Sequence, residues 1–182
     1  MAQTDEQLMS AYCAGDQAAF RELFGRYGER LALAALRIVG DEAAARDVVQ
    51  QTFLQLHRAR NDYDPSRSFR PWLYTIAMNL ARDERRRQGR RREDALDMEP
   101  EADLGAQHPE QVVATQERRR VMASALATLS EDQRQVVVLH WYEGLSFPEI
   151  AQTTGAGLSA VKVRAHRAYK KLRAVLGQRE EE

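Results

Sequence analysis

The stretch SFPEIAQTTGAGLSAVKVRAHRAYKKLR, residues 146–173, predicts two helices joined by a tight turn. Ser146 and Glu149 stand three residues apart, the spacing at which two such side chains cap a helix start reciprocally. Pro148 is tolerated in the first turn, because the amide donors there lack partners anyway. Gly155 is expected to end this short helix, since glycine adopts positive φ at low cost.

The second helix of this stretch is expected to begin near Ala160 and to run without a breaker to Gly177. Ser159 offers the N-cap. Two helices joined by a glycine-containing turn form a helix-turn-helix. The C-terminal part of the chain is therefore predicted to carry this motif.

The helix after Ser159 divides into an apolar and a basic face. An inward stripe recurs with helical period at Val161, Ala165, Ala168, Leu172 and Val175. The opposite face is basic and has no acid, as a recognition helix needs in a major groove, although a solvated surface helix is the commoner origin of such a face. The candidate DNA-contacting residues are Ser159, Lys162, Val163, Arg164, His166, Arg167 and Lys170.

Composition indicates an all-α protein with two parts. The chain has 182 residues, few aromatic side chains and a net charge of zero. That zero conceals an uneven distribution, because residues 82–92 hold seven arginines and two acids whereas residues 93–117 hold eight acids and no base. We expect two small helical domains, residues 1–92 and 118–182, joined by a flexible acidic linker, residues 93–117.

No pattern points to a membrane, a metal or an active site. No run is apolar enough to cross a bilayer and the N-terminus lacks a signal peptide's hydrophobic core, so a cytoplasmic protein without membrane insertion is expected. The lone Cys13 is expected to be a small thiol facing the core. The histidines lie on separate elements without carboxylate or cysteine at ligand spacing, which predicts no cofactor, no metal and no enzymatic activity. They are His57, His108, His140 and His166.

Three helices are expected before residue 60. Thr4 with Gln7 caps a short first helix, Asp16 opens a longer one that ends at Gly40, and Asp41 caps the third. Apolar residues at helical spacing are expected to form the core of the second helix, namely Ala19, Phe20, Leu23, Phe24, Tyr27, Leu31, Ala34, Ala35 and Ile38. A further core behind the helix-turn-helix is expected from Val136, Val137, Leu139, Trp141 and Tyr142.

Residues 61–92 have the chemistry of a site for an unpaired nucleic-acid strand. Turn formers predict a loop from Asn61, and a helix is expected to start at Ser68. Aromatic rings stack on exposed bases, amides read base edges and guanidinium groups meet phosphates. An ordinary buried stripe is the alternative for the rings. The candidate residues are Asn61, Ser68, Trp72, Asn79, Arg82 and Arg86.

Taken together, these pieces resemble bacterial sigma factors of the short, extracytoplasmic-function (ECF) type. Residues 16–87 resemble the family's second conserved region and residues 118–176 its fourth. The resemblance is carried by AFRELFGRYGERL (19–31), RDVVQQTFLQLHRA (46–59), FRPWLYTIAMNLARDERRR (69–87) and ALATLSEDQRQVVVLHWYEGLSFPEIAQTTG (125–155). No single piece is decisive, but their order and spacing are specific.

The resemblance implies partners and roles for these residues. Core RNA polymerase would contact Asp47, Gln50 and Gln51, on a helix where the family commonly has acids in place of Arg46 and Gln51. The minus-ten promoter element would be melted by the loop 61–68 with Trp72 and Asn79, and the helix-turn-helix would read the minus-thirty-five element. An anti-sigma factor is a further expected partner.

Two other functions remain open on the residues alone. One is a regulator that binds duplex DNA through its helix-turn-helix without polymerase. Residues 69–87 argue against it, because a reader of duplex DNA has no use for strand-capturing aromatics. A nucleic-acid-processing enzyme is the more remote alternative, since no acid cluster suggests a metal site.

Overall fold

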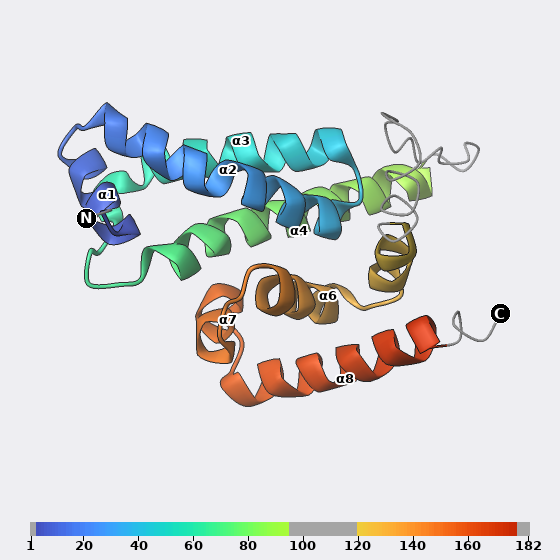
Figure 1. The fold of residues 1–182 in the computed structure, drawn as a ribbon. Helices are drawn as coiled ribbons and strands as arrows, with labels where there is room; N and C mark the ends of the chain where they lie inside the picture. Colours follow the sequence, from blue (N-terminus) through green and yellow to red (C-terminus); the bar gives the residue numbers. More distant parts are fainter. Residues whose placement is uncertain (1–2, 95–119, 178–182) are drawn as a thin grey trace, which may run out of the picture.

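The computed structural model describes residues 3–94 and 120–177, and every regular element in these two ranges is helical (Figure 1). The all-α prediction is confirmed in both helical parts. Most of the predicted linker, including Pro100, Pro109 and His108, lies outside the described residues.

The N-terminal part is formed by four α-helices and one short 3-10 turn. The predicted caps are present: Thr4 and Gln7 form a capping box, Asp16 accepts from the first amides of its helix, and Gly40 ends that helix with a φ of 79°. Asp41 caps the third helix by accepting from the amide of Ala44 at 2.7 Å. The elements are α1 (Asp5–Cys13), α2 (Gln17–Val39), α3 (Glu42–Arg58), η1 (Arg60–Asp62) and α4 (Phe69–Asp94).

The C-terminal part begins with a helix over residues 120–127. A π-helical turn, η2, continues α6, and its defining bond runs from the amide of Glu143 to the carbonyl of Val138, 3.1 Å apart. The predicted capping boxes at Ser130 and Ser146 are both present. The remaining elements are α6 (Glu131–Val137), η2 (Val138–Tyr142), α7 (Phe147–Thr154) and α8 (Leu158–Gly177).

The helix-turn-helix prediction holds except at one helix start. Gly155 ends α7 with a φ of 67°, as the turn requires. The amide of Val161 donates to the carbonyl of Gly157, so α8 begins at Leu158 rather than near Ala160. Ser159 therefore lies inside the first turn and is not the N-cap. The reason is that Gly157 provides the first helical carbonyl two residues earlier.

The two parts pack against each other around one continuous core. Leu139 and Ile150 of the C-terminal part belong to the same buried cluster as Leu31 and Tyr74 of the N-terminal part. In Figure 1, α6 and α7 lie beneath α2 and α4, with α8 below them. The described residues thus form a closed arrangement, in which the C-terminal part covers one side of the α2 and α4 helices.

Polar groups are also buried between the two parts. The Glu143 carboxylate accepts from the Tyr74 hydroxyl and lies 3.4 Å from a guanidinium nitrogen of Arg30. Burial, with the charge of Glu143, raises the pKa of Tyr74. The hydroxyl of Thr153 donates to the carbonyl of Pro71 at 3.4 Å. Because these partners are more than sixty residues apart, they fix how the parts dock.

Two predicted core residues are exposed instead. Trp141 is 69% exposed, and its ring is tilted against that of Tyr169 at a centroid distance of 5.6 Å. Phe24 is 48% exposed, and its ring packs against that of Phe53. In both cases helical spacing was right for the neighbouring positions, but the ring lies at the margin of the buried stripe. The prediction that these two rings are buried was wrong.

Ser146→Ala is expected to lower the free energy of unfolding by about 1 kcal/mol, because it removes the side-chain acceptor that caps α7. Denaturant unfolding followed by helical circular dichroism measures this loss. Ser124→Ala, an exposed serine within the helix over residues 120–127, is the matched control and should change stability little. Equal midpoints for the two variants would contradict the capping role.

Candidate nucleic-acid interfaces

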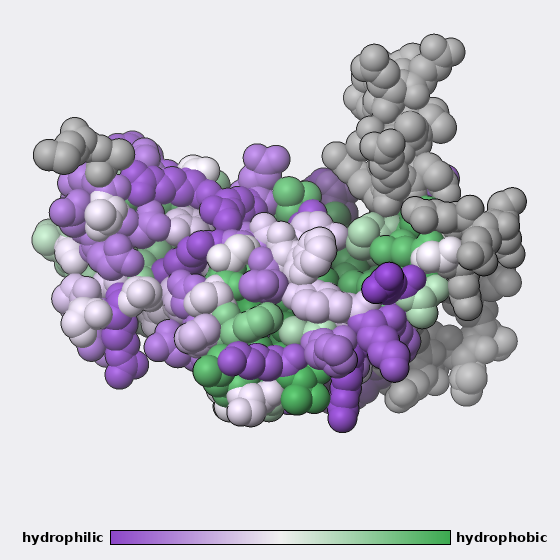
Figure 2. All heavy atoms as spheres, turned by 60° about the horizontal axis from the view of Figure 1, so that its bottom comes forward, coloured by the Kyte–Doolittle hydropathy of each residue, from purple (hydrophilic) through white to green (hydrophobic). Residues whose placement is uncertain are grey.

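The outward face of α8 presents most of the predicted duplex-reading residues to solvent. The inward stripe is buried at Val161, Ala165 and Ala168. On the opposite face Val163 is 47% exposed, so an apolar side chain lies among the basic ones on this face. Figure 2, which brings the α8 side of the molecule forward, shows mainly hydrophilic side chains with smaller apolar patches among them. The exposed candidates are Ser159, Lys162, Val163, His166, Arg167 and Lys170.

Arg164 is placed differently from the other six candidates. Its guanidinium lies 2.7 Å from a carboxylate oxygen of Asp132 at the start of α6. The side chain is half-buried, with its charged end turned back toward its own domain. In this arrangement the guanidinium of Arg164 is paired with the Asp132 carboxylate and does not project from the outward face of α8.

The predicted strand-capturing residues of α4 share one face. Trp72, Asn79 and Arg86 follow one another at intervals of seven residues, which places them in line along a helix. Asn79 and Arg86 are exposed, and Trp72 is half-buried. Asn61, in η1, and Ser68, just before α4, are exposed on the preceding loop.

Trp72 is held by an aromatic residue that the sequence analysis did not single out. The Tyr63 ring lies 5.0 Å from that of Trp72 and 6.1 Å from that of Phe69. The Tyr63 hydroxyl donates to the carbonyl of Arg67 at 3.0 Å, which closes the loop upon itself. Burial raises the pKa of Tyr63 to about 12. The available signal was an aromatic residue in an otherwise polar loop.

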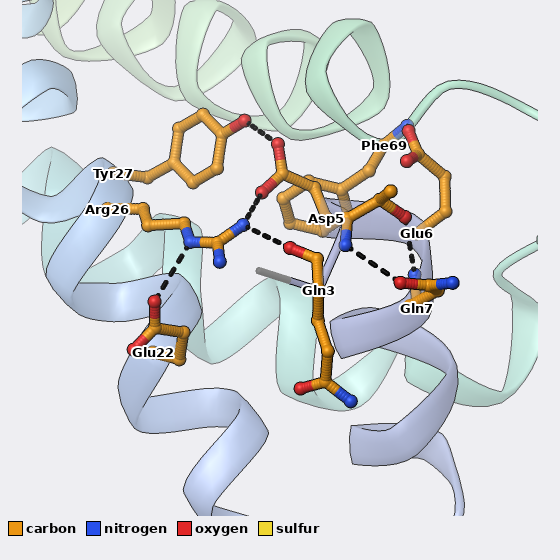
Figure 3. Close-up of polar contacts among 9 residues, drawn as sticks. Gln3, Asp5, Glu6, Gln7, Glu22, Arg26, Tyr27 and Phe69 are labelled. Carbon is orange, nitrogen blue, oxygen red and sulfur yellow. Dashed lines mark hydrogen bonds and ion pairs between the residues drawn. The ribbon is translucent and has the colours of Figure 1, made fainter. Parts of the chain in front are cut away.

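Helix α1 joins the start of α4 to α2, as Figure 3 shows. Its Glu6 carboxylate accepts from the amide of Phe69, the first residue of α4, at 3.0 Å. Asp5 pairs with Arg26 of α2 at 2.8 Å and also accepts from the Tyr27 hydroxyl. The α1 helix therefore caps α4 and ties the end of the loop to α2, although none of its residues was predicted to be functional.

Arg82 is engaged with the C-terminal part. Its Nε lies 2.7 Å from Glu131, and one Nη lies 3.3 Å from Asp132 and donates to the Gln135 amide oxygen at 2.7 Å. The Nε contact is an ion pair with poor hydrogen-bond alignment, because neither atom has a hydrogen-bond partner although both are buried. Arg85 is structural as well, since it donates to the carbonyl of Ile38 at 2.7 Å.

The predicted polymerase-contacting residues lie exposed on α3. Asp47, Gln50 and Gln51 all face solvent. Gln50 borders a shallow groove with a mainly apolar lining that includes Phe53 and Leu54. Residue spacing alone did not reveal this groove, because it forms where α1, α2 and α3 meet.

Neither a metal site nor a membrane span is found in the described ranges. Residues 3–94 and 120–177 contain no group of three or more potential metal-ligating side chains. Nor do these ranges hold a helix with the length and apolar character that crossing a bilayer requires.

Comparison with known proteins matches both parts of the chain to one family. Residues 23–91 match Sigma-70 region 2 and residues 119–172 match Sigma-70, region 4. RNA polymerase sigma factor CarQ of Myxococcus xanthus is 41% identical over 173 residues, covering 94% of this chain and 97% of CarQ. The ECF RNA polymerase sigma-E factor of Escherichia coli is 34% identical over 175 residues, covering 91% of this chain and 90% of that protein.

A solved structure supports the same assignment. The structure of CnrH in complex with the cytosolic domain of CnrY is 34% identical, has a TM-score of 0.74, and covers 96% of this chain and 97% of CnrH. CnrH itself is an RNA polymerase sigma factor of Cupriavidus metallidurans. The chain belongs to the RNA polymerase sigma factors, within the ECF group. It binds core RNA polymerase and directs promoter-specific initiation of transcription.

Proposed function

We propose that this sigma factor divides promoter recognition between its two parts, with α4 and its loop opening the minus-ten element and α8 reading the minus-thirty-five element. The observation that supports this most directly is the outward face of α8, where six predicted contact residues are exposed and no acid interrupts them. Transcription in vitro with core polymerase and a promoter library tests it. Absence of promoter-dependent transcripts would overturn it.

Strand opening is proposed to occur without a nucleotide-driven step. Opening DNA forfeits about 1.4 kcal/mol of stacking per base-pair step. Capturing an unstacked base on a protein ring returns about 1–3 kcal/mol. Trp72, with its ring supported by Tyr63, is the proposed stacking platform, and the exposed amide of Asn79 lies on the same helix face. Captured bases can thus offset much of the opening cost.

Arg167→Ala is expected to reduce discrimination at the minus-thirty-five element by about 1–3 kcal/mol, because Arg167 is exposed on the face that enters the major groove. Lys170→Ala is the matched comparison. If Lys170 contacts a phosphate, its loss should weaken binding to all promoter sequences uniformly. Competition binding of holoenzyme to promoter variants measures both. If Arg167→Ala left the ranking of promoters unchanged, base reading by Arg167 would be refuted.

Asp47→Arg is expected to weaken association with core polymerase about tenfold, or ~1.4 kcal/mol, because it reverses an exposed charge in the proposed docking face. That face combines α3 with the apolar groove beside Gln50, since protein interfaces commonly have an apolar centre and a polar rim. Titration of labelled protein with core enzyme gives the affinity. Glu29→Arg on α2 is the control, and equal affinities for the two variants would exclude this face.

Regulation by an anti-sigma factor is also proposed. CnrH, the structural relative, was solved in complex with the cytosolic domain of CnrY. A comparable partner would compete for the surfaces that bind polymerase. We further propose that the protein acts in the cytoplasm, where it meets core polymerase, and that it has no cofactor and no catalytic activity of its own.

A further inference from the structure

The loop between α3 and α4 begins on a side chain that turns back over α3. This segment, residues 60–68, is called the strand-capture loop below. Arg60, its first residue, donates from Nη1 to the carbonyl of His57 at 2.7 Å, and His57 lies in the last turn of α3. Carbonyls in that turn have no partner within their own helix. Arg60 therefore closes the end of α3 immediately before Asn61.

The same guanidinium nitrogen also contacts the ring of His57. Arg60 Nη1 lies 3.3 Å from Nε2, and the Tyr12 hydroxyl is hydrogen-bonded to Nδ1. A guanidinium donates hydrogen bonds and accepts none. Nε2 must therefore be the acceptor, so His57 is a neutral imidazole whose proton lies on Nδ1 and is donated to the Tyr12 oxygen. The contact with Arg60 thus requires one protonation state of this ring.

Protonation of His57 would remove the contact between Nε2 and Arg60. It would place an N–H on Nε2, so that two donors and two positive charges would face each other across 3.3 Å. Of its two bonds to His57, Arg60 would keep the one to the carbonyl. The arrangement is therefore complete above the pH range in which the imidazole titrates, and it weakens as pH falls through that range.

The neighbouring titratable groups keep their charge between about pH 5 and pH 8, where histidine titrates. Burial raises the pKa of Tyr12 and of Cys13, so the hydroxyl and the thiol stay protonated. Hydrogen bonds from Ser66 hold the pKa of Asp64, further along the loop, below its usual value, so this carboxylate stays ionised. From α2, uncharged side chains such as Gln17 line the groove that His57 borders.

Helix α1 holds both ends of the strand-capture loop. The Cys13 thiol donates to the carbonyl of Arg60 at 2.9 Å, and the Glu6 carboxylate accepts from the amide of Phe69 at 3.0 Å. The candidate strand-capturing residue Asn61 follows Arg60 directly in η1. Because the far end is tied to α1 as well, a displaced Arg60 changes the course of the loop between the two anchors.

We propose that Arg60 is a positioning residue for strand capture and that neutral His57 holds it in place, so that capture of the minus-ten strand weakens as His57 becomes protonated. The proposal rests on the proposed strand-capturing role of the loop that begins at Arg60. Neither residue contacts DNA in this account, since Arg60 acts through the placement of Asn61.

The first measurement uses the free chain. Side-chain NMR of histidine, with His57 assigned by the His57→Gln variant, gives the tautomer and its titration between about pH 5.5 and pH 8. Neutral His57 should carry its proton on Nδ1, and the amide shifts of residues 61–68 should follow its titration. In Arg60→Ala these shifts should no longer follow it. A proton on Nε2, or loop shifts that ignore the titration of His57, would overturn the proposal.

The second measurement uses holoenzyme and a promoter whose minus-ten region is held open as a mismatched bubble, with fluorescence anisotropy giving the affinity. From about pH 7.5 to pH 5.5, affinity should fall about two- to fivefold more for wild type than for His57→Gln, which carries no charge at either pH. His140→Gln, the same change at a histidine of η2, is the matched control and should keep the wild-type pH profile. Arg60→Ala should bind more weakly and show the shallower profile of His57→Gln.

Identical pH profiles for wild type and His57→Gln would refute the positioning role of Arg60 in strand capture. Failure of wild-type holoenzyme to bind the bubble at any pH would contradict the proposed function of the loop itself. The two failures are distinguishable, because NMR of the free chain detects the contact between Arg60 and His57 without DNA or polymerase.

Discussion

Replacing Arg134 with Ala is expected to lower the free energy of unfolding by about 3 kcal/mol, the largest stability loss anticipated for this chain. Arg134 is only 3% exposed, and its guanidinium donates to the carbonyls of Leu126 at 2.9 Å, Ala127 at 3.1 Å and Leu129 at 3.3 Å. Removing it takes hydrogen bonds away from these carbonyls and opens a cavity. A fourth bond, to Ile38 at 3.3 Å, reaches the N-terminal part.

Denaturant unfolding followed by circular dichroism measures this loss. Burial lowers the pKa of Arg134 to about 10, so the side chain is still charged at neutral pH and its carbonyl partners compensate for the lost hydration. Arg134→Lys should fall between wild type and Arg134→Ala, because an ammonium group has three donors but no planar fork. Arg58→Ala, at an exposed arginine of α3, serves as control. Similar midpoints for Arg134→Ala and Arg58→Ala would disprove the structural role.

Replacing Trp72 with Ala is expected to reduce formation of the open promoter complex about tenfold to a hundredfold, equivalent to roughly 1–3 kcal/mol of lost stacking. The ring is half-buried against Tyr63 and Phe69, at 5.0 and 6.0 Å, so part of it stays accessible to solvent. Binding to core polymerase should persist, because Trp72 lies on α4 and not on α3. Permanganate reactivity of unpaired thymines in the holoenzyme complex reports the effect.

Two variants separate stacking from folding in this experiment. Trp72→Phe retains an aromatic ring and should restore much of the opening. Trp141→Ala removes the other tryptophan, which is exposed on η2, and should leave opening intact. Normal permanganate reactivity in Trp72→Ala would exclude the ring as the stacking platform.

Local features of the fold were predictable because their causes lie within a few residues. Thr4, Asp16, Ser130 and Ser146 all cap the helices that their spacing indicated. Gly155 takes the left-handed conformation that a helix-turn-helix turn needs. The buried stripe of α8 was likewise predictable, since its period is set by helical geometry.

Long-range pairings were not predictable from the same information. Arg82 was expected to be available for DNA, but it pairs with acids about fifty residues away. Arg164 pairs with Asp132 in the same network. Charge patterning identifies a basic residue but not the acid that tertiary packing places beside it. The exposed rings of Phe24 and Trp141 have a related cause, because periodicity does not show where a buried stripe ends.

The π-helical turn at η2 sets the rotational phase between α6 and the residues that follow it in the C-terminal part. Its extra residue shifts everything that follows by about 100° relative to an uninterrupted α-helix. With this offset Leu139 is buried, Trp141 points outward and Glu143 meets the Tyr74 hydroxyl. A chain one residue shorter here could still form every helix, yet its acid would point away from its partner. The inserted residue thus brings one of the buried polar contacts between the two parts into register.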